Sequence, residues 1–214
     1  MDRPNVVGTI HSAGGFSAAA GTAITAAEVR VDLLPVVPRT IDFEAVPVPV
    51  ILTVRRRDEG GGKAWTDAER RALYLKYLPF VRAIDIEGRS LHSLRKIVEA
   101  AKTAGCAIIV SYHDFSGTPS LAQMRKYETA ARAAGADVVK IASTTTRPAE
   151  VARLLDLLDG ASGPLAVMGM GKLGRASRLL FARAGSVLNY GWLDRPQVPG
   201  QWGAGEFCDL LARA

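Results

Sequence analysis

"IIVSYHDFSGTPS" (residues 108–120) and "ADVVKIAST" (residues 136–144) are the two stretches that decide the fold. Each contains a short run rich in Ile and Val, the pattern of a strand buried on both faces of a parallel sheet. In the first stretch the apolar run is followed by Ser111, Tyr112, His113 and Asp114, ahead of a Gly-Thr-Pro turn. In the second stretch Lys140 lies inside the apolar run itself. Both strands therefore carry a reactive side chain where packing alone would favour an apolar one.

Similar apolar runs occur on either side of these two stretches, separated by segments with helical periodicity. The run at 90–105 predicts a helix with Ser90 as N-cap, and the run at 118–135 predicts one with Thr118 as cap and Pro119 first. Further helices are predicted over 65–78, 147–160 and 176–185, whereas glycines in 11–26 and prolines in 35–48 favour only short or irregular ones. The predicted strands cover residues 6–10, 27–34, 49–55, 81–87, 107–113, 138–143, 165–171 and 186–191.

Eight strands alternating with helices predict an α/β fold, a closed (β/α)8 or TIM barrel, formed as a single domain by residues 1–214. The alternative is an open, doubly wound sheet. "GMGKLG" (169–174) resembles a dinucleotide-binding loop, but it follows the seventh strand instead of the first and lacks the downstream acid. We therefore favour the barrel.

The composition narrows the class of protein. The chain has 214 residues, 48% of them hydrophobic, and a net charge of +6 that favours a small anionic substrate. Basic residues are dispersed, and the one dense run, "TVRRRDEGGGK", is interrupted by acids, which argues against nucleic-acid binding. The absence of a long apolar run or secretory leader and the presence of only two cysteines predict a cytoplasmic protein that does not bind membranes.

The residues that could carry chemistry lie where the predicted strands end. In a barrel these ends meet at one rim, and consecutive strands are neighbours about 4.8 Å apart. We expect His113 and Lys140 to lie close together there, and a lysine in an apolar setting loses its proton readily and can attack a carbonyl. Arginines from three strands would suit a carboxylate. The candidates are Glu28, Arg30, Arg55, Glu59, Asp85, Glu87, His113, Lys140, Ser177, Arg178, Gln197 and Gln201.

Each candidate also has a purely structural interpretation. Lys140 could be paired with Asp85 or Glu87, His113 could be a hydrogen-bonded core residue, and Glu59 could be a solvated loop acid. No metal site is predicted, because the histidines at 11, 92 and 113 do not fall at metal-ligand spacing. A serine nucleophile motif of the G-x-S-x-G type is also missing from the chain.

The order of these residues closely resembles the type I 3-dehydroquinate dehydratases of the shikimate pathway. Six segments match in register and span most of the chain. They are "EVR" (28–30), "TVRRRDEGG" (53–61), "SYHDF" (111–115), "VVKIA" (138–142), "MGKLGRASR" (170–178) and "PGQ" (199–201).

The resemblance implies a lyase that converts 3-dehydroquinate to 3-dehydroshikimate by syn elimination of water through a lysine Schiff base, without metal or cofactor. It implies that Lys140 forms the imine, that His113 moves the protons and that Glu59 orients His113. It also implies that Arg178 and Gln201 bind the substrate carboxylate, and that Glu28, Arg30 and Arg55 bind ring hydroxyls and order the site. The "PGQ" loop resembles the family's lid. The small-molecule substrate is the expected partner, and a homodimer the expected assembly.

The chain departs from the family pattern in two places. Gln197 stands where the family commonly has a serine, which puts one carboxylate contact in doubt, although an amide could replace it. The first quarter of the chain is also short. Two alternative functions stay open at this stage: another Schiff-base lyase of the aldolase kind acting on a keto acid or sugar phosphate, and a non-catalytic barrel that binds a ligand.

Overall fold

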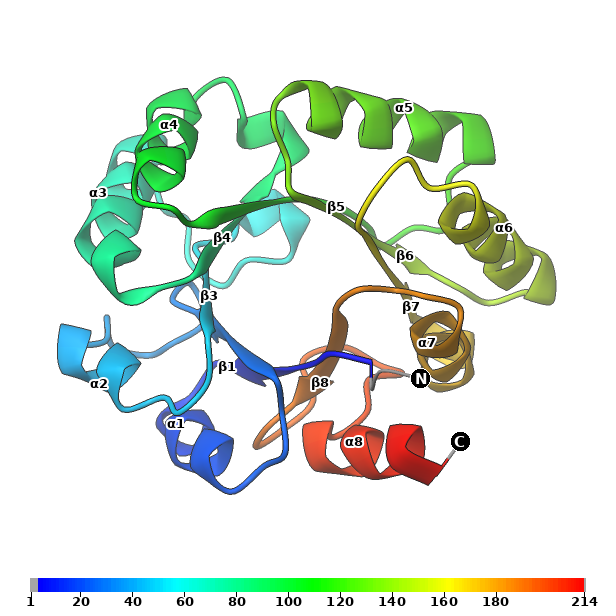
Figure 1. The fold of residues 1–214 in the computed structure, drawn as a ribbon, viewed down its shortest axis with the longest axis horizontal. Helices are drawn as coiled ribbons and strands as arrows, with labels where there is room; N and C mark the ends of the chain where they lie inside the picture. The colour runs from blue at the N-terminus through cyan, green and yellow to red at the C-terminus, as the bar shows by residue number, and fades with distance from the viewer. Residues whose placement is uncertain (1–3, 214) are drawn as a thin grey trace.

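Eight parallel strands form a barrel in a computed structural model that describes residues 4–213 (Figure 1). The strands are hydrogen-bonded in the order β7-β6-β5-β4-β3-β2-β1-β8, and every ladder is parallel. The predicted barrel is therefore confirmed. The strands are β1 (Val6–Ile10), β2 (Ala26–Arg30), β3 (Val50–Thr53), β4 (Ala83–Glu87), β5 (Ala107–Asp114), β6 (Val138–Thr144), β7 (Leu165–Met170) and β8 (Asn189–Trp192).

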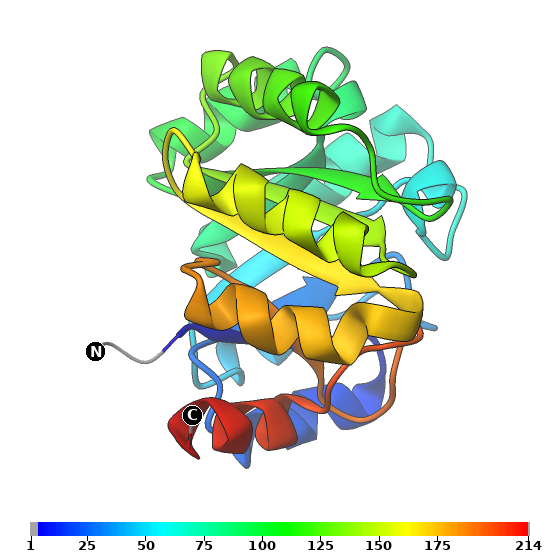
Figure 2. The same cartoon turned by 90° about the vertical axis from the view of Figure 1, so that its right-hand side faces the viewer.

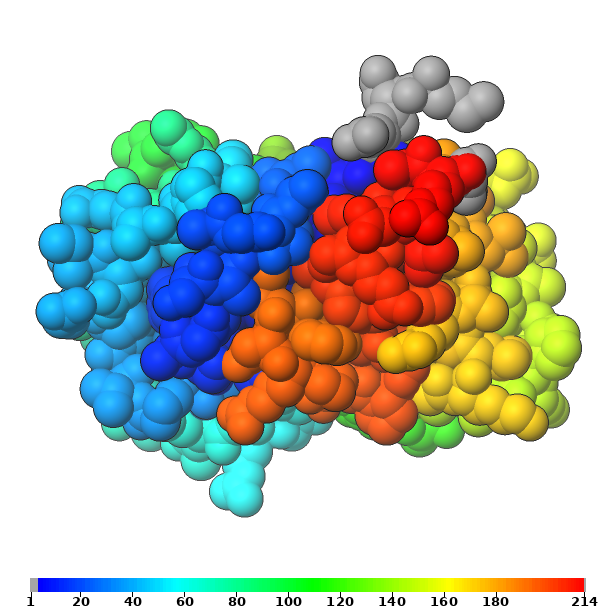
Figure 3. Space-filling view, turned by 90° about the horizontal axis from the view of Figure 1, so that it is seen from below, coloured from blue at the N-terminus to red at the C-terminus, as the bar shows by residue number. Residues whose placement is uncertain are grey.

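The barrel is nearly closed, with its seam between β7 and β8, the two strands at the ends of the hydrogen-bonded order. β1 pairs with β8 over Val6–Thr9, so the two ends of the chain lie side by side. Figure 3 shows this on the surface, where the blue first helix borders the orange and red final segments. On the other side of β8, the Val187 N–H donates to the Leu165 carbonyl at 3.0 Å, which connects the approach to β8 with β7.

A ring of helices covers the outside of the strands, as Figures 1 and 2 show. The two early helices are short, as predicted: the first contains Gly14 and Gly15 and ends at Gly21, and prolines lie on both sides of the second. Among residues 4–213 no helix is both long and apolar enough to cross a bilayer. The helices are α1 (Ala13–Ala20), α2 (Thr40–Glu44), α3 (Asp67–Tyr77), α4 (Arg95–Thr103), α5 (Leu121–Ala133), α6 (Pro148–Asp159), α7 (Gly174–Arg183) and α8 (Ala204–Arg213).

Two predicted helix starts are wrong. Ser90 does not cap α4; it ends the short 3₁₀ helix η3 (Gly88–Ser90), and α4 begins only at Arg95. The Ser90 hydroxyl instead accepts a hydrogen bond from Arg70, so a tertiary contact outweighs the local capping preference. At α5 the cap is Ser120, which accepts from the Gln123 N–H, and Thr118 instead donates to the Thr144 carbonyl.

The alternation of side chains along each strand separates two cores. Outward-facing residues pack under the helices, and inward-facing residues fill the barrel. Away from the carboxyl ends of the strands the interior is apolar, and Val7, Ile51, Ala83, Ile109 and Ala166 belong to one cluster there. Towards the carboxyl ends of the strands the inward positions become charged. The fold therefore turns every functional side chain of these strands towards one end of the barrel.

Candidate active site

A cavity of about 430 Å³ opens at the carboxyl ends of the strands. All eight residues for which the sequence predicted a catalytic or substrate-binding role line it, although they come from seven different segments of the chain. Gln197 also faces this cavity, whereas the predicted neighbours Asp85 and Glu87 lie beneath it. The eight residues are Glu28, Arg30, Arg55, Glu59, His113, Lys140, Arg178 and Gln201.

Lys140 lies at the inward-facing centre of β6 and is 4% exposed. The expectation of an apolar setting is wrong for its ammonium group. The Nζ atom lies 2.8 Å from Asp85 Oδ2 and 3.2 Å from Glu28 Oε1, and 4.0 Å from the centroid of the Tyr190 ring. The ion pair with Asp85 that the structural interpretation predicted is therefore present, yet Lys140 still lines the cavity. A paired but accessible lysine is held at a defined place and remains available to a ligand.

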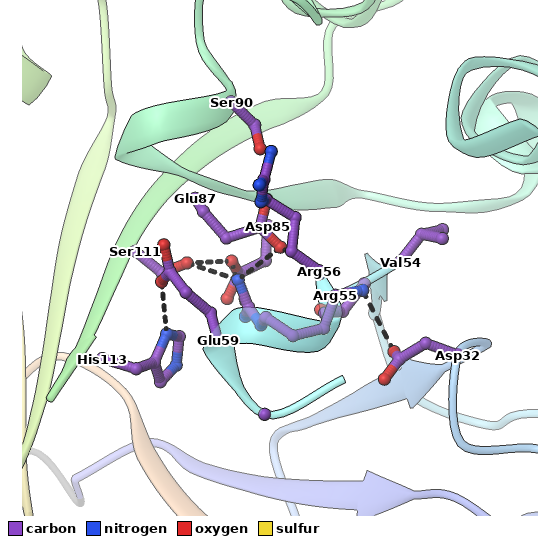
Figure 4. A network of polar contacts seen from close by, with 12 residues as sticks. Asp32, Val54, Arg55, Arg56, Glu59, Asp85, Glu87, Ser90, Ser111 and His113 are labelled. Carbon is purple, nitrogen blue, oxygen red and sulfur yellow. Dashed lines mark hydrogen bonds and ion pairs between the residues drawn. The ribbon is translucent and has the colours of Figure 1, made fainter. Parts of the chain in front are cut away.

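The pair belongs to a row of alternating charges that crosses the end of the barrel. Figure 4 shows the middle of this row, where Arg55 lies beside Asp85 and Glu87. Arg55 lies at its centre, 1% exposed, with Nη2 2.8 Å from Asp85 Oδ1 and Nη1 3.3 Å from Glu87 Oε1. Glu87 in turn contacts Arg70 of α3. In order, the row is Arg70, Glu87, Arg55, Asp85, Lys140 and Glu28, so three cations alternate with three carboxylates.

This alternation compensates the loss of hydration of each buried charge. Burial by itself would raise the pKa of Asp85, but the nearby charges of Arg55 and Lys140 outweigh it and hold that pKa well below its usual range. Ser111 contributes to the same point, since its hydroxyl donates to Asp85 Oδ1 at 2.6 Å and accepts from Arg55 Nη1. The network therefore fixes the positions of its members and keeps Asp85 ionised.

Glu59 and His113 form a second pair at the rim. Glu59 ends the 3₁₀ helix η1 (Arg57–Glu59), and the turn after it needs a glycine, because Gly60 has a φ of 83°. Glu59 Oε2 lies 3.1 Å from His113 Nδ1. Burial raises the pKa of Glu59 to about 7. Burial and the charges of Arg55 and Lys140 lower the pKa of His113 well below its usual value. His113 is therefore a neutral imidazole, as a proton acceptor requires.

Arg178 differs from every other buried cation in the part of the chain that the structure describes, because no carboxylate lies within ion-pair distance of it. Its guanidinium donates to two backbone carbonyls, those of Gly169 and Tyr190, at 3.0 and 2.9 Å. Burial lowers its pKa to about 10, which still leaves it charged at neutral pH. A buried, uncompensated cation on a cavity wall attracts an anionic ligand group.

Two amides lie near this end of the cavity. Gln201 Oε1 accepts a hydrogen bond from the backbone N–H of Gln197 at 3.1 Å. The side-chain Nε2 of Gln197 is buried and has no partner among residues 4–213. A buried donor without an acceptor is unfavourable unless a ligand satisfies it. Gln197 and Arg178 therefore both line the cavity with hydrogen-bond donors.

Arg30 is tied to the rim instead of pointing freely into the cavity. Its guanidinium makes two parallel hydrogen bonds to Asp32, at 3.0 and 2.7 Å, and a third to the Gly60 carbonyl. Asp32 also accepts from the N–H groups of Arg55 and Gly62. This cluster joins the end of β2 to the loop that carries Glu59. It holds Arg30, the end of β2 and the loop that carries Glu59 together.

Sequence reasoning missed several members of the site. Ser111 shares a strand face with His113, so the two-residue period could have revealed it. Asp32 lies two residues beyond Arg30, just outside the strand that ends there. Tyr190 of β8 packs in the apolar interior cluster, and its hydroxyl is buried without a partner among the residues that the structure describes. Its membership of the site is seen only in the structure, where its ring lies next to the Lys140 ammonium group.

A (β/α)8 barrel whose mouth holds a lysine, a carboxylate-bound histidine and an unpaired arginine defines an enzyme class: barrel lyases that act through a lysine on a carbonyl. The comparison with known proteins narrows this class. The family model of the type I 3-dehydroquinases matches residues 15–212, and the chain belongs to this family.

Individual relatives agree with this assignment. The chain is 34% identical over 202 residues to the 3-dehydroquinate dehydratase of Methanocella arvoryzae, covering 92% of this chain and 91% of that protein. The crystal structure of the Aquifex aeolicus 3-dehydroquinate dehydratase has a TM-score of 0.87 at 28% identity and covers 98% of both chains. The Geobacillus kaustophilus enzyme, with a TM-score of 0.90 at 21% identity, covers 98% of this chain and 90% of that one and supports the fold. An aldolase or a non-catalytic barrel is not favoured.

Proposed function

We propose that this protein is a hydro-lyase that converts 3-dehydroquinate to 3-dehydroshikimate and water, with the whole chain acting as one catalytic domain. The observation that carries the proposal is the placement of Lys140 within one cavity with the Glu59–His113 pair and the unpaired Arg178. These groups are the nucleophile, the proton acceptor and the anion site that a β-elimination next to a ketone needs in a carboxylate-bearing substrate.

The first step joins Lys140 to the substrate. The amine attacks the C3 ketone, and loss of water leaves a protonated imine. Glu28 Oε1 lies 3.2 Å from Nζ, within reach of the proton that the ammonium must lose. Asp85 Oδ2, 2.8 Å from Nζ, stays ionised because Arg55 and Lys140 hold the pKa of Asp85 well below its usual range, and it then stabilises the positive charge of the imine. The pairing of Lys140 is therefore part of the chemistry and not a competing structural role.

His113 carries the protons of the second step. With Glu59 ionised, Nδ1–H donates to Glu59 and the lone pair of Nε2 accepts the proton from C2. The electrons of the broken C–H bond flow into the imine and give an enamine. The enamine then expels the C1 hydroxyl, which takes the proton from His113 and departs as water. One residue serving both transfers accounts for a syn elimination. Hydrolysis of the imine releases the ketone product and regenerates Lys140.

The substrate carboxylate is assigned to the other end of the cavity. Arg178 offers a charge without a carboxylate partner, and Gln197 Nε2 and Gln201 supply amides beside it. We assign Gln197 the contact that the family's serine makes. We assign the ring hydroxyls to Glu28, Arg30 and Arg55, which line the same cavity.

The segment between β8 and α8 acts as the lid over this end. It crosses the mouth with its backbone attached to the loop after β7, since the Gly171 N–H donates to the Pro199 carbonyl at 3.0 Å. At Gly200 the same segment passes so close that a Cβ would meet the Gly171 carbonyl at 2.4 Å. A lid at this place would exclude water from the imine.

We further propose that the protein works in the cytoplasm as a homodimer, without binding nucleic acid or membranes. The absence of nucleic-acid binding is supported by the dispersal of the basic residues along the sequence, since a nucleic-acid site needs them clustered. Light scattering during size-exclusion chromatography measures the assembly, and a monomeric mass at micromolar concentration would contradict the dimer.

The decisive experiment is reductive trapping. The protein is mixed with 3-dehydroquinate and sodium borohydride, its intact mass is measured, and the modified peptide is mapped. We expect one adduct, on Lys140, and enone absorbance from product when borohydride is left out. Enone absorbance without an adduct would refute the imine mechanism, and absence of both would refute the proposed substrate.

A further inference from the structure

Arg89 lies outside the cavity but contacts Glu59, one of the residues that line it. It belongs to η3, the 3₁₀ helix that follows β4, and its side chain is 51% exposed. Its Nε atom lies 2.9 Å from Glu59 Oε1, and its Nη1 lies 3.2 Å from Asp58 Oδ2. Glu59 is thus held from two sides, by Arg89 on Oε1 and by His113 on Oε2. This fixes the plane of the carboxylate.

The charged groups around Glu59 come from four segments. On its own loop Asp58 opposes its ionisation, and from β4 Glu87 does the same. Arg55, beyond the end of β3, favours ionisation, but its guanidinium is directed to Asp85, Glu87 and Ser111. The remaining neighbour is the neutral His113 of β5. Within residues 4–213, Arg89 is therefore the one arginine or lysine at ion-pair distance from Glu59.

The ionisation of Glu59 decides which nitrogen of His113 carries the hydrogen. An ionised Glu59 accepts from Nδ1–H and leaves the Nε2 lone pair facing the cavity. A protonated Glu59 donates to Nδ1 instead, which places the hydrogen on Nε2 and removes the proton acceptor. Because burial already raises the pKa of Glu59 to about 7, a small change in its surroundings moves it across neutral pH.

We propose that Arg89 is a positioning residue that keeps Glu59 ionised and thereby keeps His113 in the tautomer that accepts a proton. This inference rests on the proposed function of His113. It adds a residue that does not contact substrate and acts only through the carboxylate. Since the folded-state pKa of Glu59 is raised, activity is lost as the pH falls through about 7. Without Arg89 the loss begins at higher pH.

The test compares pH profiles of kcat/KM, which report the free enzyme. Arg89→Gln should move the acid limb upward by roughly half a pH unit to one unit, the size expected for losing one partly exposed ion pair. Below the limb kcat/KM is then about threefold to tenfold lower, and above about pH 9 the two profiles converge. Arg89→Lys, which keeps the charge, should restore most of the shift.

Arg56→Gln is the matched control, because the Arg56 side chain also pairs with Asp58, at 2.9 Å, but does not contact Glu59. It should leave the limb in place. An unshifted limb in Arg89→Gln, or an equal loss at every pH, would overturn the inference. So would a shift of the same size in Arg56→Gln.

The imidazole itself provides a second readout that needs no turnover. The chain has only three histidines, so ¹⁵N-histidine labelling gives a simple spectrum, and His113→Gln identifies the His113 signals. We expect an Nδ1–H tautomer above the limb and a higher transition pH in Arg89→Gln. Equal transitions in the two proteins would refute the role of Arg89. Failure of the unmodified protein to turn over 3-dehydroquinate would refute the proposed function alone.

Discussion

The two ends of the cavity differ in whether their buried charges have partners of opposite sign. At one end Lys140, Arg55 and their neighbours alternate with carboxylates, so each buried charge meets an opposite one. At the other end, within residues 4–213, Arg178 donates only to backbone carbonyls, and the Gln197 amide has a buried donor without a partner. The first end is electrostatically complete, whereas the second lacks a negative charge.

This difference separates the part that performs the reaction from the part that selects the ligand. A nucleophile and its proton acceptor must be correctly placed before substrate arrives, which needs internal partners. A recognition site is best left incomplete, because the ligand then supplies the missing charge and gains the whole interaction. Substitutions at the two ends should therefore differ in their effects on folding and on binding.

The largest effect is expected at the complete end, from Lys140→Ala. Loss of the nucleophile should lower kcat by at least about 10⁴-fold, as removal of a covalent nucleophile does elsewhere. Steady-state assay by enone absorbance measures this, and borohydride should then trap no adduct. Turnover within tenfold of the unmodified protein would contradict the mechanism.

Next in size is Arg55→Ala, which tests whether that end depends on compensation. The change leaves Asp85 and Glu87 buried without their shared cation, and we expect it to lower the free energy of unfolding by about 3–5 kcal/mol. Urea unfolding followed by circular dichroism measures the difference. A loss below about 1 kcal/mol would mean that the alternating row contributes little to stability.

Arg178→Gln makes the same type of change at the incomplete end and should act on binding instead. Removing the cation should raise KM for 3-dehydroquinate about 10²-fold, a common result of truncating one partner of a buried charge pair. Stability should stay the same or rise, because an uncompensated buried charge is lost. Arg175→Gln is the control, since Arg175 is an exposed residue of the same helix whose guanidinium lies 4.7 Å from the Trp202 ring centroid. A KM change of equal size in both variants would contradict the assignment.

The smallest effect is expected from Gln197→Ala. One hydrogen bond from an amide to a carboxylate is worth about 1 kcal/mol in net terms, so KM should rise roughly fivefold with little change in kcat. Gln197→Ser, which restores the residue common in the family, should recover most of the affinity. An unchanged KM in Gln197→Ala would show that the lid amide does not contact substrate.

Much of the fold could be predicted from local patterns. The eight apolar runs, the helices between them and the inward direction of Glu28, Arg55 and His113 follow from side-chain alternation along strands. The errors occurred where a distant contact outweighed a local preference. Ser90 is an example, because its hydroxyl bonds Arg70 across the barrel rim instead of capping the next helix.

The site divides in the same way. The types of side chain that meet at the rim could be read from the ends of the strands, and the comparison with a family followed from their order. The surroundings of Lys140 could not be predicted, because its carboxylate partners lie 55 and 112 positions away along the chain. The absence of a carboxylate partner for Arg178 within residues 4–213 could not be predicted either, for the same reason. Apolar alternation is a local property and fixes which face a residue takes, whereas charge compensation depends on the strand register and closure that only the folded barrel supplies.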